Sequence, residues 1–161
     1  MFSPQDVQAI RERLGIPVHN DQTIRDDFFA FLEERDYSLS YKMVFLTSFI
    51  DRMDRATGCA PIEDVLDDYI AFYRDRIDRG LPVDRSSCPY NKKTLEDRKY
   101  IKRNMLTNPF EKFERKRFLC YSKDLSVISM NHALQSRLDE SDLQAIRTQM
   151  QEDLRDYYGR L

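Results

Sequence analysis

Apolar residues recur every three to four positions along most of the chain, which is the spacing of amphipathic helices. Segment 41–53 differs because its apolar residues cover more than one face, so we expect this helix to be central. Residues 81–93 are largely polar and contain two prolines, which is typical of a loop. The pattern predicts helices at about residues 4–14, 24–35, 41–53, 61–79 and 94–105, a short helix after Asn108 and a final helix after Ser141.

Capping residues indicate where several of these helices begin. Thr94 and Ser141 can each cap a helix with the side-chain hydroxyl. The run NPFE at 108–111 places a cap residue, a first-position proline and a capping-box glutamate in order. We therefore expect the helix from Thr94 to end near Met105 and a separate short helix to begin at Pro109.

Two short segments, 118–121 and 125–130, have the composition of strands, and residues 122–124 would join them as a hairpin. The sequence therefore predicts a mainly α fold, a winged-helix-like helical domain with one two-stranded β-hairpin at about 118–130. In that fold, 41–53 and 61–79 would be the first two helices. A turn around Gly58–Ala60 could add a short strand between them, and the hairpin would be the wing.

The length of 161 residues suits a single domain. We interpret residues 1–161 as one domain with three parts, an N-terminal helical extension at 1–35, a winged-helix-like core at 36–130 and C-terminal helices at 131–161. No apolar run approaches the ~20 residues needed to cross a bilayer, and the N-terminus lacks the pattern of a signal peptide. Three widely spaced cysteines indicate reduced thiols, so we expect a cytoplasmic protein without a membrane partner.

The net charge of −2 hides a strong asymmetry. Residues 91–124 carry 11 Lys and Arg against 5 Asp and Glu, whereas residues 1–90 carry 11 against 17. A basic block within an otherwise acidic chain is a candidate contact surface for phosphate groups. It is also compatible with a solvated helix face that binds nothing.

The basic block would lie on the recognition helix and wing of a winged helix. A recognition helix enters the major groove, and cations around it bind the phosphates. This predicts binding of nucleic acid, with DNA the expected form. The alternative is a protein-docking or dimerisation module with a basic face, which leaves a homodimer open. The candidate nucleic-acid contacts are Lys99, Lys102, Arg103, Lys112, Arg115, Lys116 and Lys123.

The sequence offers no pattern for catalysis, a metal or a cofactor. The cysteines and the two histidines show neither CxxC nor HxxxH spacing, and no glycine-rich loop is present. We therefore expect no enzyme activity, no catalytic residue, no bound metal and no cofactor. Cys59 and Cys120 are interpreted as buried free thiols, and Cys88 lies in a loop where it could be exposed. The rings of Tyr157 and Tyr158 could form a docking face.

Three blocks of the sequence resemble an accessory domain of bacterial DEAD/DEAH-type helicases. These blocks are SYKMVFL at 40–46, YIAFYRDR at 69–76 with GLPV at 80–83, and NPFEKF at 108–113. Such helicases are restriction and phage-defence proteins that often carry a phospholipase-D-like nuclease, and the resemblance spans about residues 36–160. It implies a non-catalytic module in antiviral defence, with a helicase or nuclease domain as partner. Helicase ATP-binding motifs and the HxK nuclease motif are absent, so no catalytic residue is carried over.

Overall fold

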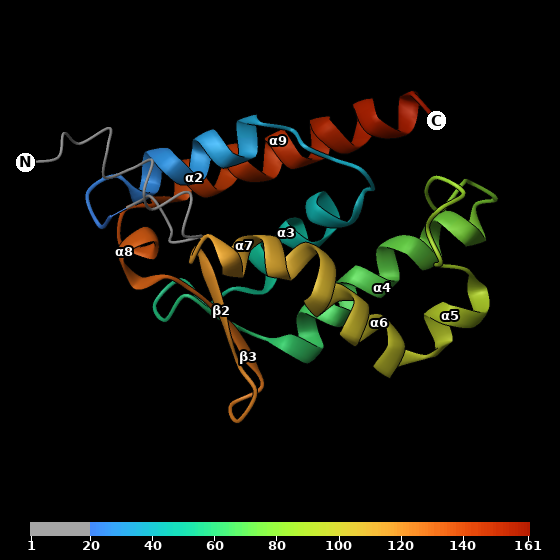
Figure 1. Cartoon of the computed structure of the whole chain (residues 1–161), viewed down its shortest axis with the longest axis horizontal. Coiled ribbons are helices and arrows are strands. Elements are labelled where there is room, and N and C mark those ends of the chain that lie inside the picture. The colour runs from blue at the N-terminus through green and yellow to red at the C-terminus, as the bar shows by residue number, and fades with distance from the viewer. Residues whose placement is uncertain (1–19) are drawn as a thin grey trace, which may run out of the picture.

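The computed structural model describes residues 20–161, and the helix predicted at 4–14 lies outside them. Within the described part the chain is mainly helical, with a small antiparallel sheet (Figure 1). The elements in chain order are α2 (Ile24–Glu33), α3 (Tyr41–Arg52), β1 (Cys59–Pro61), α4 (Ile62–Asp78), α5 (Lys92–Glu96), α6 (Arg98–Met105), η1 (Leu106–Phe110), α7 (Glu111–Arg115), β2 (Leu119–Ser122), β3 (Val127–Met130), α8 (His132–Gln135) and α9 (Glu140–Gly159).

The sheet has the strand order β1-β3-β2, with both pairs antiparallel. Strand β1 lies between α3 and α4 in the chain, and the β2–β3 hairpin follows α7. Ser129 of β3 is opposite Cys59 on one side and Cys120 on the other. The predicted mainly helical fold with a hairpin is confirmed, and the turn around Gly58 does lead into a short third strand.

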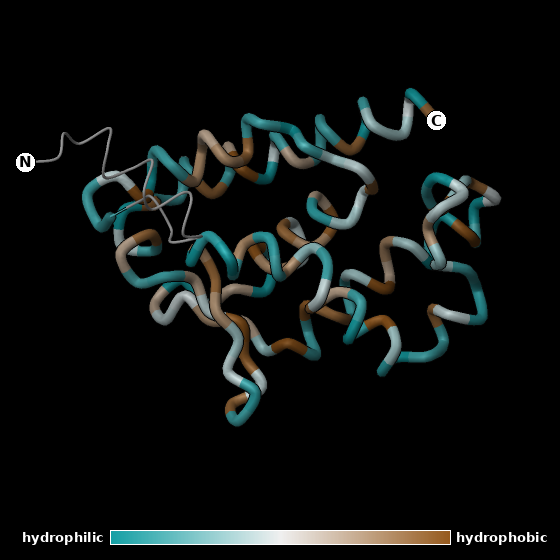
Figure 2. The backbone as a smooth tube through the Cα atoms, viewed as in Figure 1, coloured by the Kyte–Doolittle hydropathy of each residue, from teal (hydrophilic) through white to brown (hydrophobic). Residues whose placement is uncertain are grey.

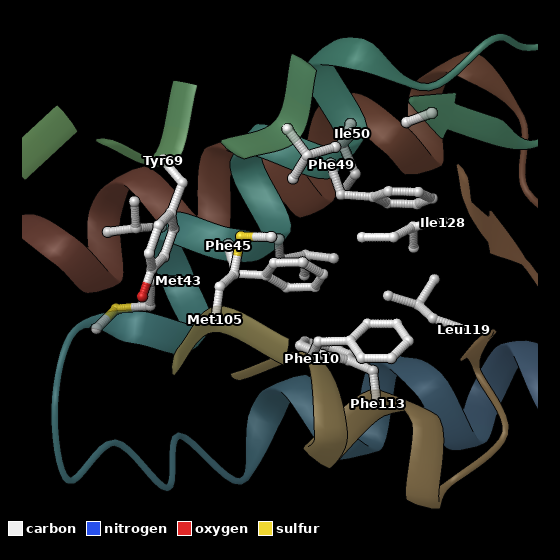
Figure 3. Packing of buried hydrophobic residues seen from close by; sticks show 14 of the residues in the cluster. Met43, Phe45, Phe49, Ile50, Tyr69, Met105, Phe110, Phe113, Leu119 and Ile128 are labelled. Atoms are coloured by element: carbon white, nitrogen blue, oxygen red, sulfur yellow. The ribbon is translucent and has the colours of Figure 1, made fainter. Parts of the chain in front are cut away.

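Helix α3 is central, as its sequence predicted. Nine of its twelve residues are buried, and it packs against α4, α9 and η1. The ring of Phe45 lies 6.0 Å from that of Phe110 and 5.8 Å from that of Phe113, centroid to centroid. Figure 3 shows these rings together with Phe49 of α3 and Ile128 of the sheet. The core thus joins the central helix to the α6–α7 segment and to the wing.

Helix α2 belongs to the same hydrophobic core. Apolar and hydrophilic residues alternate along this helix (Figure 2), and its buried residues are Ile24, Phe28 and Leu32. Phe28 makes an edge contact with Phe118 at 5.0 Å between centroids, and Phe31 contacts Phe113 at 5.5 Å. The second half of the predicted N-terminal extension therefore packs directly against α7 and the start of the hairpin.

Helix α6 continues into α7 through one π-helical turn, η1, and Pro109 lies inside it. The prediction of a new helix capped by Asn108 is wrong. The Asn108 side chain donates from Nδ2 to the carbonyl oxygen of Asn104 at 3.1 Å, so it bonds back to the preceding turn. The wider turn accommodates the missing N–H and the bulky ring of Pro109. Burial of Phe110 and Phe113 on one side of the helix holds the two parts together.

The helix predicted to begin at Thr94 is two helices. Asn91 caps α5, because its Oδ1 accepts from the Thr94 N–H at 2.9 Å. Helix α5 ends at Glu96, and Asp97 caps α6 through the Tyr100 N–H at 3.1 Å. Thr94 is therefore the reciprocal partner in a capping box and not the cap itself.

The cap of α9 is also different from the predicted one. Asp139 and not Ser141 precedes the helix, and its Oδ1 accepts from the Asp142 N–H at 2.8 Å. The Asp142 carboxylate in turn accepts from the Asp139 N–H, and it pairs with Arg25 Nη2 of α2 at 2.7 Å. The arginine lowers the pKa of Asp142. The cap therefore also connects the start of α9 to α2.

The loop after α4 is fastened by one carboxylate. Asp84 accepts hydrogen bonds from the N–H and hydroxyl of Ser40, at the start of α3, and from the Tyr157 hydroxyl. Tyr158 donates its hydroxyl to the Val83 carbonyl oxygen at 2.7 Å. Tyr157 is buried and Tyr158 partly buried, so the interpretation of these rings as a free docking face is wrong. They hold the loop against the core.

Candidate nucleic-acid interface

The predicted nucleic-acid contacts lie on one continuous stretch of structure, the α6–η1–α7 helix and the hairpin after it (Figure 1, yellow to orange). One side of this helix is buried through Ile101, Met105, Phe110 and Phe113. Because those residues occupy the core side, the charged residues between them are directed to other faces. The charged faces of α6 and α7 have different surroundings.

At the α6 end, the cations nearest α4 are paired. Arg98 Nη2 lies 2.8 Å from Asp67 Oδ1 and donates to the Glu63 carbonyl oxygen at 2.9 Å. Lys102 Nζ lies 3.1 Å from Glu63 Oε2. The Lys102 hydrogen bond and the nearby Arg98 lower the pKa of Glu63. Of the predicted contacts, Lys102 therefore forms an ion pair that joins α6 to α4.

Lys99 and Arg103 lie on another face of α6. They are four residues apart, which puts them on the same side of a helix, and both are exposed. Neither has an ion-pair partner among residues 20–161. These two predicted contacts are placed where an external anion can reach them.

On α7, Arg115 is exposed and lies 3.6 Å from Glu111 Oε1, one turn back on the same helix. Exposed pairs of this kind contribute at most about 0.5 kcal/mol, so the arginine remains available to a phosphate. Lys112 and Lys116 are partly buried. Lys112 lies on the side of α7 that faces the beginning of α3, which places it beside the buried Lys42.

The wing adds cations at both of its ends. Lys123 is exposed in the turn between β2 and β3, next to Leu125, which is 73% exposed. Arg117 is exposed where α7 ends, with a left-handed φ of 58°. Its carbonyl oxygen accepts from Asn131 Nδ2 at 3.0 Å. Arg117 is absent from the predicted contacts, although it continues the basic run of α7 and could have been included on that ground.

An acidic region borders the α6 end of this surface. Asp67, Asp75 and Asp78 of α4 and Glu96 of α5 line a groove of about 410 Å³ together with Arg74 and Arg98. Carboxylates in this position repel a phosphate backbone. A phosphate backbone would therefore approach the basic surface from the side of α7 and the wing, because the carboxylates of α4 repel it on the other side. We call Lys99, Arg103, Lys112, Arg115, Lys116, Arg117 and Lys123 the α7–wing surface.

In the part of the chain that the structure describes, no three His, Cys, Asp or Glu side chains are grouped as metal ligands. The expectation that Cys59 and Cys120 are buried is wrong, since Cys59 is partly exposed and Cys120 is exposed. Cys88 is partly buried, and its Sγ lies 3.3 Å from the Tyr41 hydroxyl. Among the described helices, none is long and apolar enough to cross a membrane.

Comparison with known proteins gives no match for this chain, whether with protein-family models, curated proteins or solved structures. The resemblance to a helicase accessory domain therefore stays a prediction, as do its implied partners. The α7–wing surface is the feature on which a functional proposal can be built.

Proposed function

We propose that this chain is a non-catalytic nucleic-acid-binding module whose α7–wing surface contacts the phosphate backbone of DNA. The observation that carries the proposal is the set of exposed cations along the continuous α6–η1–α7 helix, at its end and on the hairpin turn, in a fold with the strand order β1-β3-β2. These exposed cations are Lys99, Arg103, Arg115, Arg117 and Lys123. In winged helices the helix before the wing is the element that enters the major groove. The proposal extends to a cytoplasmic module that acts beside a helicase or nuclease domain in antiviral defence.

The expected mode of binding is electrostatic. The arginines and lysines of the α7–wing surface would neutralise phosphates and release counterions, which makes affinity fall steeply with salt. The expected slope is about −0.9 log units in affinity per log unit of salt for each neutralised phosphate. Sequence preference would come from groove contacts, for which Thr107 and Asn108 are exposed polar candidates on η1.

The test is a charge reversal at three points of the surface. A variant with Arg103→Glu, Arg115→Glu and Lys123→Glu should lose at least ~100-fold in duplex DNA affinity, measured by fluorescence anisotropy as a function of salt. The matched control carries Arg79→Glu, Arg155→Glu and Arg160→Glu, three exposed arginines away from α7 and the wing.

The control has the same change in net charge, so it separates a local contact from a general electrostatic effect. It should retain most of the wild-type affinity and salt slope. Equal losses in the two variants, or a wild-type affinity that does not change with salt, would refute the proposal.

A second candidate function is supported by the opposite charges of two neighbouring regions. The acidic residues of α4 and α5 and the cations of the α7–wing surface lie on one molecule, so two copies could pair basic to acidic. This alternative, a docking or homodimerisation module, predicts a dimer by sedimentation at low salt. The triple α7–wing variant would then become monomeric, whereas a DNA-binding monomer would show no change in mass.

A further inference from the structure

A small pocket lies between the start of α3 and the π-helical turn η1. Its volume is about 70 Å³, and its polar lining comes from Asp36, Ser38, Lys42, Asn108 and Lys112. Three parts of the chain meet here: the connection from α2, the first turn of α3 and the junction of α6 with α7. The π-helical turn is what places Asn108 and Pro109 at this position, because it displaces the helix path locally.

Lys42 is the unusual residue of this pocket. Only 3% of its surface is exposed, although lysine is among the residues that are least often buried without a partner. Its Nζ lies 3.8 Å from the ring centroid of Phe31 and 5.7 Å from that of Tyr37. Within residues 20–161 the ammonium has no carboxylate within 4 Å and no hydrogen-bond acceptor. The aromatic rings compensate its lost hydration only in part.

Charged groups of both signs surround Lys42. The second lysine, Lys112, comes from α7 and repels it, while Glu34 and Asp36 attract it from the connection between α2 and α3. Burial and then the charge of Lys112 lower the pKa of Lys42 to about 8. Both lysines line the same small cavity, and each disfavours the charged form of the other. A bound anion would offset this repulsion and accept hydrogen bonds from the ammonium.

The start of α3 is also positive, and the Asp84 carboxylate already accepts from the N–H and hydroxyl of Ser40 there. The first N–H groups of a helix have no acceptor within the helix, and the helix dipole is positive at this end. Helix α3 has twelve residues, no acidic residue in its first turn and no cap bond from the side chain of its own cap residue, Ser40. Helices α2 and α4, in contrast, carry two acidic residues each in their first turns.

We propose that this pocket binds a single phosphate group, held by the ammonium groups of Lys42 and Lys112 with Asn108 and Ser38 beside it. A volume of about 70 Å³ corresponds to roughly two water molecules in the liquid, which suits the oxygens of one phosphoryl group and is too small for a base or a sugar. Asp36 reduces the net positive charge, so the site favours one phosphate over a chain of them.

The phosphate has two sources that share this chemistry. It is either a free phosphate ion or a phosphate of the DNA backbone, and the second source rests on the proposed function. Lys112 belongs both to the pocket and to the α7–wing surface, so a strand that crosses α7 passes the mouth of the pocket. One phosphate inserted here would fix the register of the strand on the protein.

The first experiment measures the thermal unfolding midpoint of the full chain at pH 7 in sodium phosphate and in sodium chloride of equal ionic strength. Phosphate should raise the midpoint of the wild type in a saturable manner. Lys42→Met keeps an unbranched apolar side chain. It should raise the phosphate concentration needed for half of the rise in the midpoint at least ~10-fold. Lys99→Met is the matched control, since Lys99 is exposed and does not line the pocket, and it should respond as the wild type does.

The pocket is refuted if phosphate and chloride act alike on the wild type, or if Lys42→Met keeps the full response. Should Lys42→Met fail to fold, Lys112→Gln is used instead. Because Lys112 lies at the mouth of the pocket, this variant should also lose the rise of the unfolding midpoint with phosphate. A full response in Lys112→Gln would then overturn the proposal.

The second experiment separates the two sources with duplex DNA. If the ligand is a backbone phosphate, Lys42→Met should lose ~10-fold in duplex affinity and reduce the salt slope by about one. If duplex affinity is unchanged while the phosphate response is lost, the pocket holds free phosphate. A retained phosphate response in a chain that does not bind DNA would refute the proposed function and leave the pocket in place.

Discussion

The cations of the basic segment form two groups, those that face α4 and those that do not. At the α6 end, Arg98 and Lys102 are paired with Glu63 and Asp67 of α4. At the α7 end the helix is held by phenylalanine contacts from α2 and α3. Arg115 and Arg117 are exposed there, whereas Lys112 and Lys116 are partly buried. Cations that face the acidic helix α4 are paired within the fold, whereas exposed arginines such as Arg103 and Arg115 lie where an external anion can reach them.

The largest effect is expected from removing an apolar contact under α7. Phe113 is fully buried and touches the rings of Phe28, Phe31 and Phe45. Phe113→Ala should lower the free energy of unfolding by about 3–5 kcal/mol, because the lost contacts leave a cavity. Urea unfolding followed by circular dichroism measures this. A loss below ~1 kcal/mol would show that α7 is not held by its apolar side.

An intermediate effect of opposite sign is expected at Lys42. Lys42→Met should raise the free energy of unfolding at pH 7 by about 1–2 kcal/mol, because it removes a buried charge without an anionic partner. A variant that is more stable but no longer responds to phosphate is the behaviour of a binding residue. A destabilised variant would mean that the ammonium has a structural role.

The pH dependence of the same residue gives a separate check. The pKa of Lys42 is lowered in the folded chain, to about 8 from an ordinary 10.5. Between these values the unfolded chain binds the proton and the folded chain does not, so stability rises with pH. The advantage of Lys42→Met over the wild type should therefore be full below pH 8 and shrink towards pH 10. An advantage that is constant over this window would contradict the lowered pKa.

The smallest effect is expected at the α6 end. Replacing Arg98 and Lys102 together by glutamine should lower the free energy of unfolding by about 1 kcal/mol or less, and less at high salt, because the ion pairs are exposed. DNA affinity should change less than threefold, since these cations face α4. A loss of affinity as large as that of the triple α7–wing variant would remove the distinction between cations that face α4 and cations that do not.

Much of the fold could be predicted because the apolar spacing is regular. The central position of α3, the bounds of α4 and the hairpin all follow from residues that repeat at helical or strand spacing. The helix start at Asn108 could not be predicted correctly. Its cap pattern is local, while the continuity of α6 and α7 depends on burying Phe110 and Phe113 against α2 and α3.

The candidate site was predicted only as a set of charges. The sequence grouped Lys102 with Lys99 and Arg103, because nothing local shows that Glu63 lies across from it. Lys42 did not stand out at all, since its burial comes from Phe31 of α2 and from the turn at Pro109. Contacts between segments distant in sequence decide which cations are paired, which are exposed and which are enclosed.

The carboxylate of Asp84 has a consequence for how the molecule opens. It joins the loop after α4, the first turn of α3 and the last turns of α9, three segments that are far apart in the sequence. Segments that are joined by one partly buried hydrogen-bond acceptor can open together as a cooperative unit, which hydrogen exchange of their amides would show. Fraying that begins at the end of α9 would therefore reach the start of α3, and with it the wall of the phosphate pocket, before the rest of the core is disturbed.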